Sequence, residues 1–120
     1  MDPHFDGVIF KTHAGEVRRR LRVAFPHCWV VDVRKREEFE SGHIPGALWA
    51  PPDGIAKLPE GTTDRTEFIV VGKEPEDPSM RAASLALKGL GAHRVVELTG
   101  GMVEWGLARG PIEGTEPRAA

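Results

Sequence analysis

The chain has 120 residues, of which 40% are hydrophobic and 28% are charged, and its formal net charge at pH 7 is −2. This length and composition are typical of one soluble globular domain. The nearly balanced charge provides no overall electrostatic attraction to nucleic acid or acidic lipid, so neither is expected as a partner. No apolar run approaches the ~18 residues that a membrane-spanning helix requires, and the N-terminal stretch MDPHFDG lacks the apolar core of a signal peptide.

Residues that would indicate a metal site or a redox function are few. Cys28 is the single cysteine, which precludes an intramolecular disulfide and fits a cytoplasmic location. The five histidines are scattered, with no pair four residues apart and no Cys-x-x-Cys motif to join them. The sequence therefore predicts no metal site and no cofactor.

The first expected elements are a short strand and an amphipathic helix. Gly7–Phe10 forms the strand, and the helix follows from Thr12, its expected N-cap, to about Arg22. Four arginines lie in the helix: Arg18, Arg19, Arg20 and Arg22. We interpret them as a solvated helix face rather than as a binding patch for an anionic partner.

The next stretch contains the strongest predicted strand. Trp29–Val33 is a β-branched and aromatic run, as in a central strand that is covered on both faces. Arg36–Ser41 is expected as a short helix that ends at Gly42 in the C′ position. A further short strand at Ala47–Ala50 and one helical turn at Ile55–Leu58 follow.

The second half repeats the alternation of strand and helix. Phe68–Val71 is an apolar strand, and the helix after it begins near Met80 with Ser79 as its expected cap. Arg94–Leu98 is the last strand, and the final helix follows the Gly-Gly pair with Met102 and Trp105 on its inner face. This alternation predicts an α/β fold, a three-layer α/β/α domain with a mainly parallel sheet of about five strands. We expect one domain over residues 1–108 and a flexible tail over 109–120.

Two segments resemble the signatures of rhodanese-like domains. Residues 30–51, VVDVRKREEFESGHIPGALWAP, contain a strand ending in Asp-Val-Arg, a Glu-Glu-Phe helix and a Gly-His-Ile-Pro-Gly-Ala turn in the order that this family uses. Residues 89–105, GLGAHRVVELTGGMVEW, resemble its second signature. In the first segment we expect Asp32 to be a buried, paired carboxylate. Arg34 would then tie down adjacent loops, and His43 would brace the backbone rather than act as a base.

The resemblance also implies where catalysis would occur. Active members of the family carry a cysteine at the end of the fourth strand, where loop amides and a helix N-terminus stabilise the thiolate and bind the anionic sulfur donor. In this chain Gly72 falls at that position, and glycine has no side chain to hold sulfur. The rest of the equivalent loop consists of Lys73, Glu74, Pro75, Glu76, Asp77, Pro78, Ser79, Met80 and Arg81.

The composition of this loop also opposes the expected chemistry. Its two prolines remove backbone donors, and its three acidic residues outnumber Lys73 and would repel a thiosulfate or phosphate dianion. Arg81 could bind an anion, but we expect it to pair with Glu76 or Asp77 instead. The loop is therefore a specific departure from the pattern of an active enzyme.

Three functions remain open. The sequence favours a catalytically inactive module, binding or regulatory, that takes a protein partner or small ligand at loop 72–81. A sulfurtransferase-type enzyme with a non-standard site would use Cys28, or a different reaction would use Asp77, Ser79 and Arg81. A structural or oligomerisation domain is the third alternative, although no oligomeric state is indicated. Because Cys28 precedes its strand, it is expected at the edge of the sheet away from the loop, as an inert thiol.

Overall fold

The computed structural model describes residues 8–23, 27–50 and 54–114. Their central feature is a five-stranded, all-parallel sheet in the order β1-β5-β4-β2-β3. The strands are β1 (Phe10–Thr12), β2 (Cys28–Asp32), β3 (Leu48–Trp49), β4 (Glu67–Val71) and β5 (Arg94–Leu98). The helices are α1 (Ala14–Val23), α2 (Arg36–Ser41), α3 (Pro78–Gly89) and α4 (Gly101–Leu107). The predicted α/β fold is confirmed.

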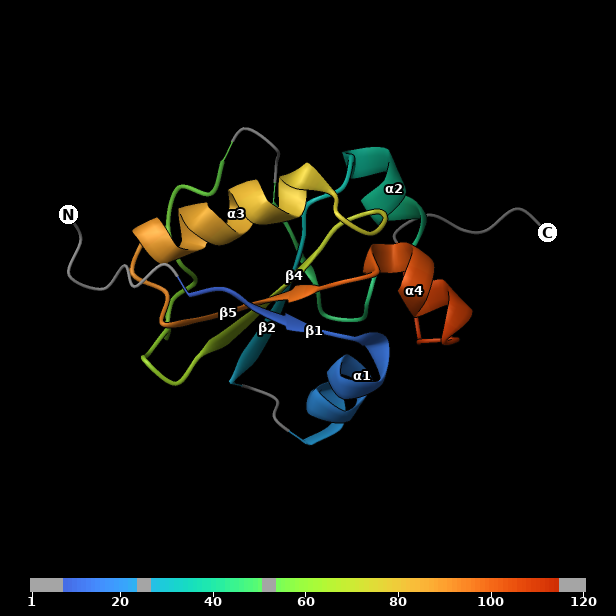
Figure 1. The fold of residues 1–120 in the computed structure, drawn as a ribbon, viewed down its shortest axis with the longest axis horizontal. Helices are drawn as coiled ribbons and strands as arrows, with labels where there is room; N and C mark the ends of the chain where they lie inside the picture. The colour runs from blue at the N-terminus through green and yellow to red at the C-terminus, as the bar shows by residue number, and fades with distance from the viewer. Residues whose placement is uncertain (1–7, 24–26, 51–53, 115–120) are drawn as a thin grey trace.

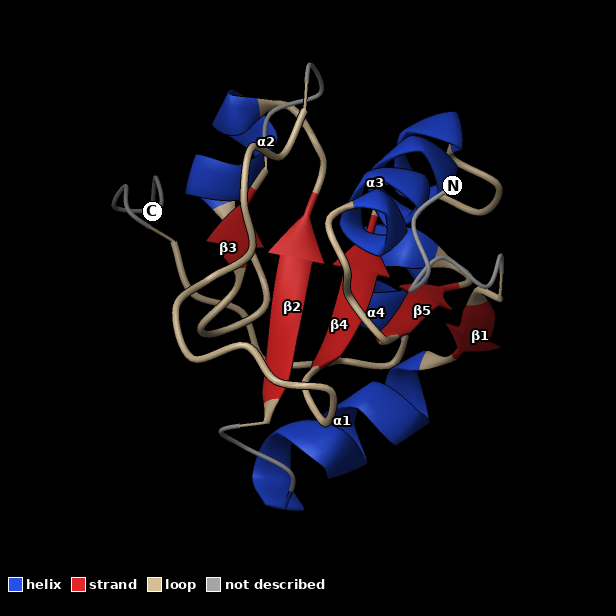
Figure 2. Ribbon diagram, turned by 90° about the vertical axis from the view of Figure 1, so that its left-hand side faces the viewer, coloured by secondary structure: helices blue, strands red, loops and turns tan. Residues whose placement is uncertain are grey.

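Helices lie on both faces of the twisted sheet, with α3 on one side and α1 on the other (Figures 1 and 2). Successive strand residues point to opposite faces, so Ile69 packs with Val17 of α1 and Trp105 of α4. Val70 packs on the opposite face with Leu87 of α3. All five residues of β4 are buried, which fits a central strand covered on both sides.

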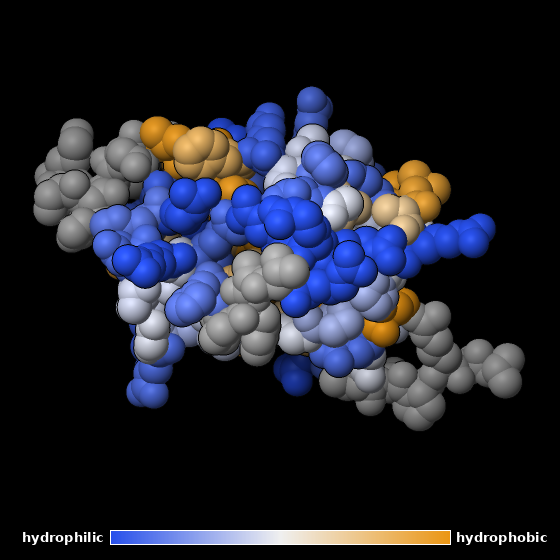
Figure 3. Space-filling view, turned by 90° about the horizontal axis from the view of Figure 1, so that it is seen from below, coloured by the Kyte–Doolittle hydropathy of each residue, from blue (hydrophilic) through white to orange (hydrophobic). Residues whose placement is uncertain are grey.

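The arginines of α1 form a largely hydrophilic surface, as predicted. Figure 3 views the molecule from the side on which α1 lies and shows mostly hydrophilic residues, with small apolar areas toward the two ends. Arg19 and Arg20 both bond to Glu16, and Arg20 also pairs with the buried Glu67. Arg18 donates to the carbonyl oxygen of Ala108. Three of the four guanidinium groups are therefore engaged within the protein.

The start of the chain differs from the expected boundaries. The first strand is Phe10–Thr12 rather than Gly7–Phe10, and Gly7 itself lies outside the described residues. Its register is set by pairing with β5, which aligns Thr12 with Leu98 and so places Thr12 in the strand. The amide of Ala14, the first residue of α1, instead donates a hydrogen bond to Oε1 of Glu104 at 2.9 Å. A carboxylate distant in sequence thus replaces the expected Thr12 cap.

Two further expectations are wrong. Ile55–Leu58 does not form a helical turn; the segment crosses the α3 side of the sheet in non-helical conformation, with Ile55 and Leu58 packed against the core. Gly42 ends α2, but its φ of 172° is extended rather than left-handed. Its carbonyl oxygen accepts a bond from Arg34 at 2.6 Å, and its amide donates to Glu38 and Phe39.

Part of the segment that was expected to be a flexible tail makes defined contacts. The amide of His43 donates to the carbonyl oxygen of Glu113 at 2.8 Å, and the reverse bond has the same length. The indole nitrogen of Trp105 donates to the carbonyl oxygen of Pro111 at 2.9 Å. Within the described ranges, none of the helices is both long and apolar enough to cross a membrane.

Candidate functional site

The loop between β4 and α3 lies where parallel strands end, which is the usual ligand-binding edge of such a sheet. In Figure 1 it lies beside α2 and α4. Lys73 pairs with Glu38 of α2 at 3.6 Å, and the amides of Met102 and Val103 of α4 donate to the carbonyl oxygens of Gly72 and Lys73 at 2.9 and 3.1 Å. The loop is therefore held from both sides.

Gly72 follows β4 directly, and no space exists for a side chain there. A Cβ atom at this position would lie 2.6 Å from Oδ2 of Asp77 and 2.8 Å from Cγ of Met80. Contacts this short require the neighbouring side chains to move. Gly72 thus lacks a thiol, and the volume that a thiol would need is occupied.

Asp77 occupies this volume and binds the loop amides. Its Oδ2 accepts a hydrogen bond from the Lys73 amide, and its Oδ1 accepts one from the Ser79 amide, both at 2.9 Å. Asp77 is therefore the N-cap of α3, with Pro78 in the first helical turn. This corrects the expectation that Ser79 is the cap. The Asp77 carboxylate therefore satisfies two of the loop's amides from within the chain.

The start of α4 packs tightly against the same loop. Gly101 has a φ of 61°, and a Cβ atom there would lie 2.8 Å from both the Glu74 amide nitrogen and the Gly72 carbonyl oxygen. Only glycine permits this approach without displacing the loop backbone. Glu74 and Glu76 are exposed and form no ion pair with any described residue, and Glu76 has the left-handed φ of 60°.

Arg81 pairs with Glu97 rather than with Glu76 or Asp77. Its Nε lies 3.0 Å from Oε2 of Glu97, and the hydroxyl of Ser84 donates to the same oxygen at 2.8 Å. Burial opposes ionisation of Glu97, but these hydrogen bonds and the nearby positive charges hold its pKa below its ordinary value. The expected pairing fails because Glu97 lies on β5, distant in sequence, and approaches α3 only in the folded sheet.

A cleft of about 240 Å³ lies on this side of the loop. It is lined by Lys11, Glu76, Asp77, Pro78, Met80, Arg81, Glu97 and Thr99. Charged side chains of both signs face it, so its walls attract neither anions nor cations strongly.

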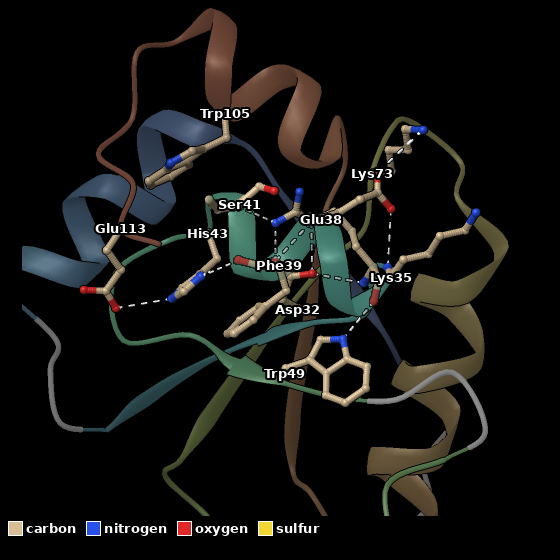
Figure 4. Close-up of polar contacts among 12 residues, drawn as sticks. Asp32, Lys35, Glu38, Phe39, Ser41, His43, Trp49, Lys73, Trp105 and Glu113 are labelled. Atoms are coloured by element: carbon tan, nitrogen blue, oxygen red, sulfur yellow. Dashed lines mark hydrogen bonds and ion pairs between the residues drawn. The ribbon is translucent and has the colours of Figure 1, made fainter. Parts of the chain in front are cut away.

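Asp32 and Arg34 form a buried ion pair behind the loop. Asp32 is 1% exposed, and both its oxygens accept from the Arg34 guanidinium, the shorter contact being 2.8 Å. The indole of Trp49, which lies below α2 in Figure 4, donates to the Arg34 carbonyl oxygen at 2.9 Å. Asp32, at the end of β2, binds Arg34, and Arg34 donates to the Gly42 carbonyl oxygen at the end of α2. The ion pair therefore connects β2 with the end of α2.

His43 braces the end of α2. Its Nδ1 lies 2.7 Å from the Phe39 carbonyl oxygen, and its ring stacks on the Phe39 ring with centroids 3.8 Å apart. Nε2 lies 3.4 Å from Oε1 of Glu113, on the other side of the ring (Figure 4). With both nitrogens engaged and the side chain buried, His43 is poorly placed to act as a base for a ligand at the loop. The sequence analysis did not identify Glu113 as a partner of His43. The only signal for it in the sequence is an acidic residue near the C-terminal end.

Cys28 lies at the opposite edge of the sheet. It begins β2, in register with Glu67, whereas Gly72 follows the last residue of β4. It is 4% exposed, and burial raises the pKa of its thiol to about 11. The thiol is therefore neutral and inaccessible near neutral pH. In the described part of the chain, no three His, Cys, Asp or Glu side chains gather in a way that could hold a metal ion.

Comparison with known proteins identifies the family of this fold. The sequence model of the rhodanese-like domain family matches residues 13–108 of this chain. The crystal structure of the BH2092 protein from Bacillus halodurans is 27% identical and superposes with a TM-score of 0.75, covering 88% of this chain and 77% of that one.

Curated proteins with similar sequences include a transcriptional regulator and an adenylyltransferase and sulfurtransferase. The HTH-type transcriptional regulator Rv0324 of Mycobacterium tuberculosis is 36% identical over 89 residues, covering 73% of this chain and 38% of the regulator. The adenylyltransferase and sulfurtransferase UBA4 of Candida albicans is 33% identical over 84 residues, covering 63% of this chain and 19% of that protein. The chain thus spans less than half the length of either relative. Its fold and the match over most of its length show that it belongs to the rhodanese-like domain family.

Proposed function

We propose that this chain is a non-catalytic, cytoplasmic rhodanese-like module that binds a partner through loop 72–81. The observation that carries the proposal is the position of Asp77, whose carboxylate fills the space beside Gly72 and binds the amides of Lys73 and Ser79. A sulfur donor would find no thiolate beside Gly72, and the Lys73 and Ser79 amides there are already bonded to Asp77. The loop retains an exposed backbone at the ligand-binding edge of the sheet, with two carboxylates, Glu74 and Glu76, available for contact.

The burial of Cys28, the single thiol, argues against the alternative of a sulfurtransferase. A nucleophilic cysteine requires an exposed thiolate, and this thiol is buried, with a pKa raised to about 11. The name of the Candida relative makes sulfur transfer the first reaction to test. We expect no transfer from thiosulfate to cyanide above the rate without protein, and no mass increase of one sulfur atom after incubation with thiosulfate. A rate that disappears in Cys28→Ala would establish the enzyme instead.

Binding through the loop is tested by affinity capture from a lysate of the source organism. The double variant Glu74→Ala/Glu76→Ala changes only exposed side chains and leaves the Asp77 cap in place. We expect it to lose proteins that the wild type retains. The matched control, Glu60→Ala/Asp64→Ala, removes two exposed carboxylates from the loop before β4 and should retain them. Identical protein sets for all three baits would count against the loop as the binding surface and favour a purely structural domain.

A further inference from the structure

We propose that the binding surface extends from loop 72–81 onto the exposed face of α4, and that it takes a protein segment carrying both basic and apolar side chains. This inference rests on the proposed function, because it identifies the chemistry of the partner at the same site. It is argued from three features: the continuity of loop and helix, the apolar strip on α4, and the charge at the loop end of that strip.

Loop and helix form one continuous surface. The amides of Met102 and Val103 donate to the carbonyl oxygens of Gly72 and Lys73, and Gly101 brings the helix backbone against Glu74. Val103 therefore stands directly beside the loop. A partner that contacts the exposed residues of the loop also reaches the first turn of α4.

The outward face of α4 is apolar. Val103 is 50% exposed and Leu107 is 82% exposed, and residues four apart lie on the same face of a helix. Gly106 lies beside them, and a Cβ there would meet no atom within 4 Å apart from its chain neighbours and the backbone of its own helix, so a partner can approach the helix backbone closely there. A single exposed leucine is common, but this pair adjoins a candidate site and offers continuous apolar area. In Figure 3 an apolar area lies toward the end of the molecule at which Figure 1 places α4.

The charge beside this strip is negative on the loop side. Glu74 and Glu76 are exposed and have no ion-pair partner among the described residues, whereas the charge of Lys73 is compensated by Glu38 at 3.6 Å. Such carboxylates repel nucleic acid and acidic peptides and attract lysine and arginine side chains. At the far end of the strip the exposed Arg109 follows Leu107, and the exposed Arg18 of α1 donates to the carbonyl oxygen of Ala108, so these cations adjoin the end of the strip away from the loop. The complementary partner therefore presents apolar side chains to α4 and basic side chains to the loop.

The test uses the full chain and a phage-displayed library of short random peptides. Selected peptides are synthesised, and their Kd values are measured by fluorescence anisotropy. We expect the selected sequences to combine Lys or Arg with aliphatic or aromatic residues. Val103→Ser/Leu107→Ser should weaken their binding by about tenfold or more, because apolar area is no longer buried. Glu74→Gln/Glu76→Gln should weaken it by about threefold or more and reduce its salt dependence.

Matched controls separate this surface from others. Leu85→Ser removes an exposed apolar side chain of α3 that is similar in exposure to Val103, and Glu60→Gln/Asp64→Asn removes two exposed carboxylates elsewhere. Both controls should bind the peptides like the wild type. All variants are checked for folding by thermal unfolding; each changes only exposed side chains.

The outcomes distinguish the inference from the proposed function. If the loop variant weakens binding and the α4 variant does not, the loop is the site but its extension onto α4 is wrong. If neither variant weakens binding, the proposed function fails as well. Selection of acidic peptides, or of none, would also overturn the inference.

Discussion

Replacing Gly72 by cysteine should not by itself restore a working sulfur-transfer site. The new Cβ would lie 2.6 Å from Oδ2 of Asp77 and 2.8 Å from Cγ of Met80, so both side chains must move. Overpacking of this kind costs about 1–3 kcal/mol. Displacing Asp77 also removes the N-cap of α3, which costs about 1 kcal/mol. We therefore expect Gly72→Cys to lower the free energy of unfolding by about 2–4 kcal/mol.

The decisive comparison is a double-mutant cycle with Asp77→Ala. That change alone should cost about 1 kcal/mol through the lost cap, and in combination with Gly72→Cys it removes the main steric conflict. The free energy of unfolding of the double variant should therefore decrease by less than the sum of the decreases in the two single variants. In Gly72→Cys the displaced Asp77 carboxylate stays in the loop, where its negative charge opposes the thiosulfate dianion. Asp77→Ala removes this charge and leaves the amides of Lys73 and Ser79 without their acceptor, so we expect the double variant to form a persulfide with thiosulfate, whereas Gly72→Cys does not.

Urea unfolding measures the stability of the four proteins of the cycle, and intact-protein mass spectrometry measures the persulfide. Additive stability effects would refute the steric reasoning, because they would mean that Asp77 and the new side chain do not compete for space. Ready persulfide formation by Gly72→Cys alone would refute the idea that Asp77 blocks the loop.

Three further predictions concern the groups around the sheet. Because folding lowers the pKa of Glu97, the ionised carboxylate stabilises the protein fully above the ordinary pKa of 4.5, and this contribution is lost as pH falls through the pKa of the folded state. Glu97→Gln or Arg81→Ala should therefore make the free energy of unfolding less sensitive to acid, as measured by unfolding at several pH values. Iodoacetamide should alkylate Cys28 slowly in the native protein at pH 8 and rapidly in denaturant, since burial raises its pKa to about 11; equal rates would contradict the buried position. Asp32→Ala leaves the Arg34 guanidinium buried without its partner and should lower the free energy of unfolding by about 3–5 kcal/mol, and a change below about 1 kcal/mol in urea titrations would show that the pair contributes little.

Local patterns predicted most of the elements of the fold. The helix Arg36–Ser41 and the strand Arg94–Leu98 have the expected boundaries, and the central strands differ by a single residue at their ends. Their apolar runs and turn residues are local properties, and alternation of such elements leaves few arrangements other than a parallel sheet. The turn at Ile55–Leu58 was predicted wrongly because its apolar residues are ordered by packing against the sheet and not by helical periodicity.

The candidate site was proposed from the sequence, but the contacts inside it were not predicted. Gly72 and the loop after it were identified by their position in the family pattern. The role of Asp77 was missed because a loop carboxylate, a proline and a serine allow more than one cap, and Ser79 was chosen. The partners of Arg81 and His43 were missed since Glu97 and Glu113 are remote in sequence and reach them only in the folded chain.

The sequence by itself determined that this protein has a rhodanese-like fold, and it led to the expectation that Gly72 stands at the position of the family's nucleophilic cysteine. Both follow from residue identity and spacing along the chain. Only the tertiary structure decided that the vacant position is filled, because the distance between Gly72 and the Asp77 carboxylate depends on how the loop folds back between β4 and α3. Likewise, the apolar strip of α4 adjoins the loop only because Gly101 permits their backbones to meet.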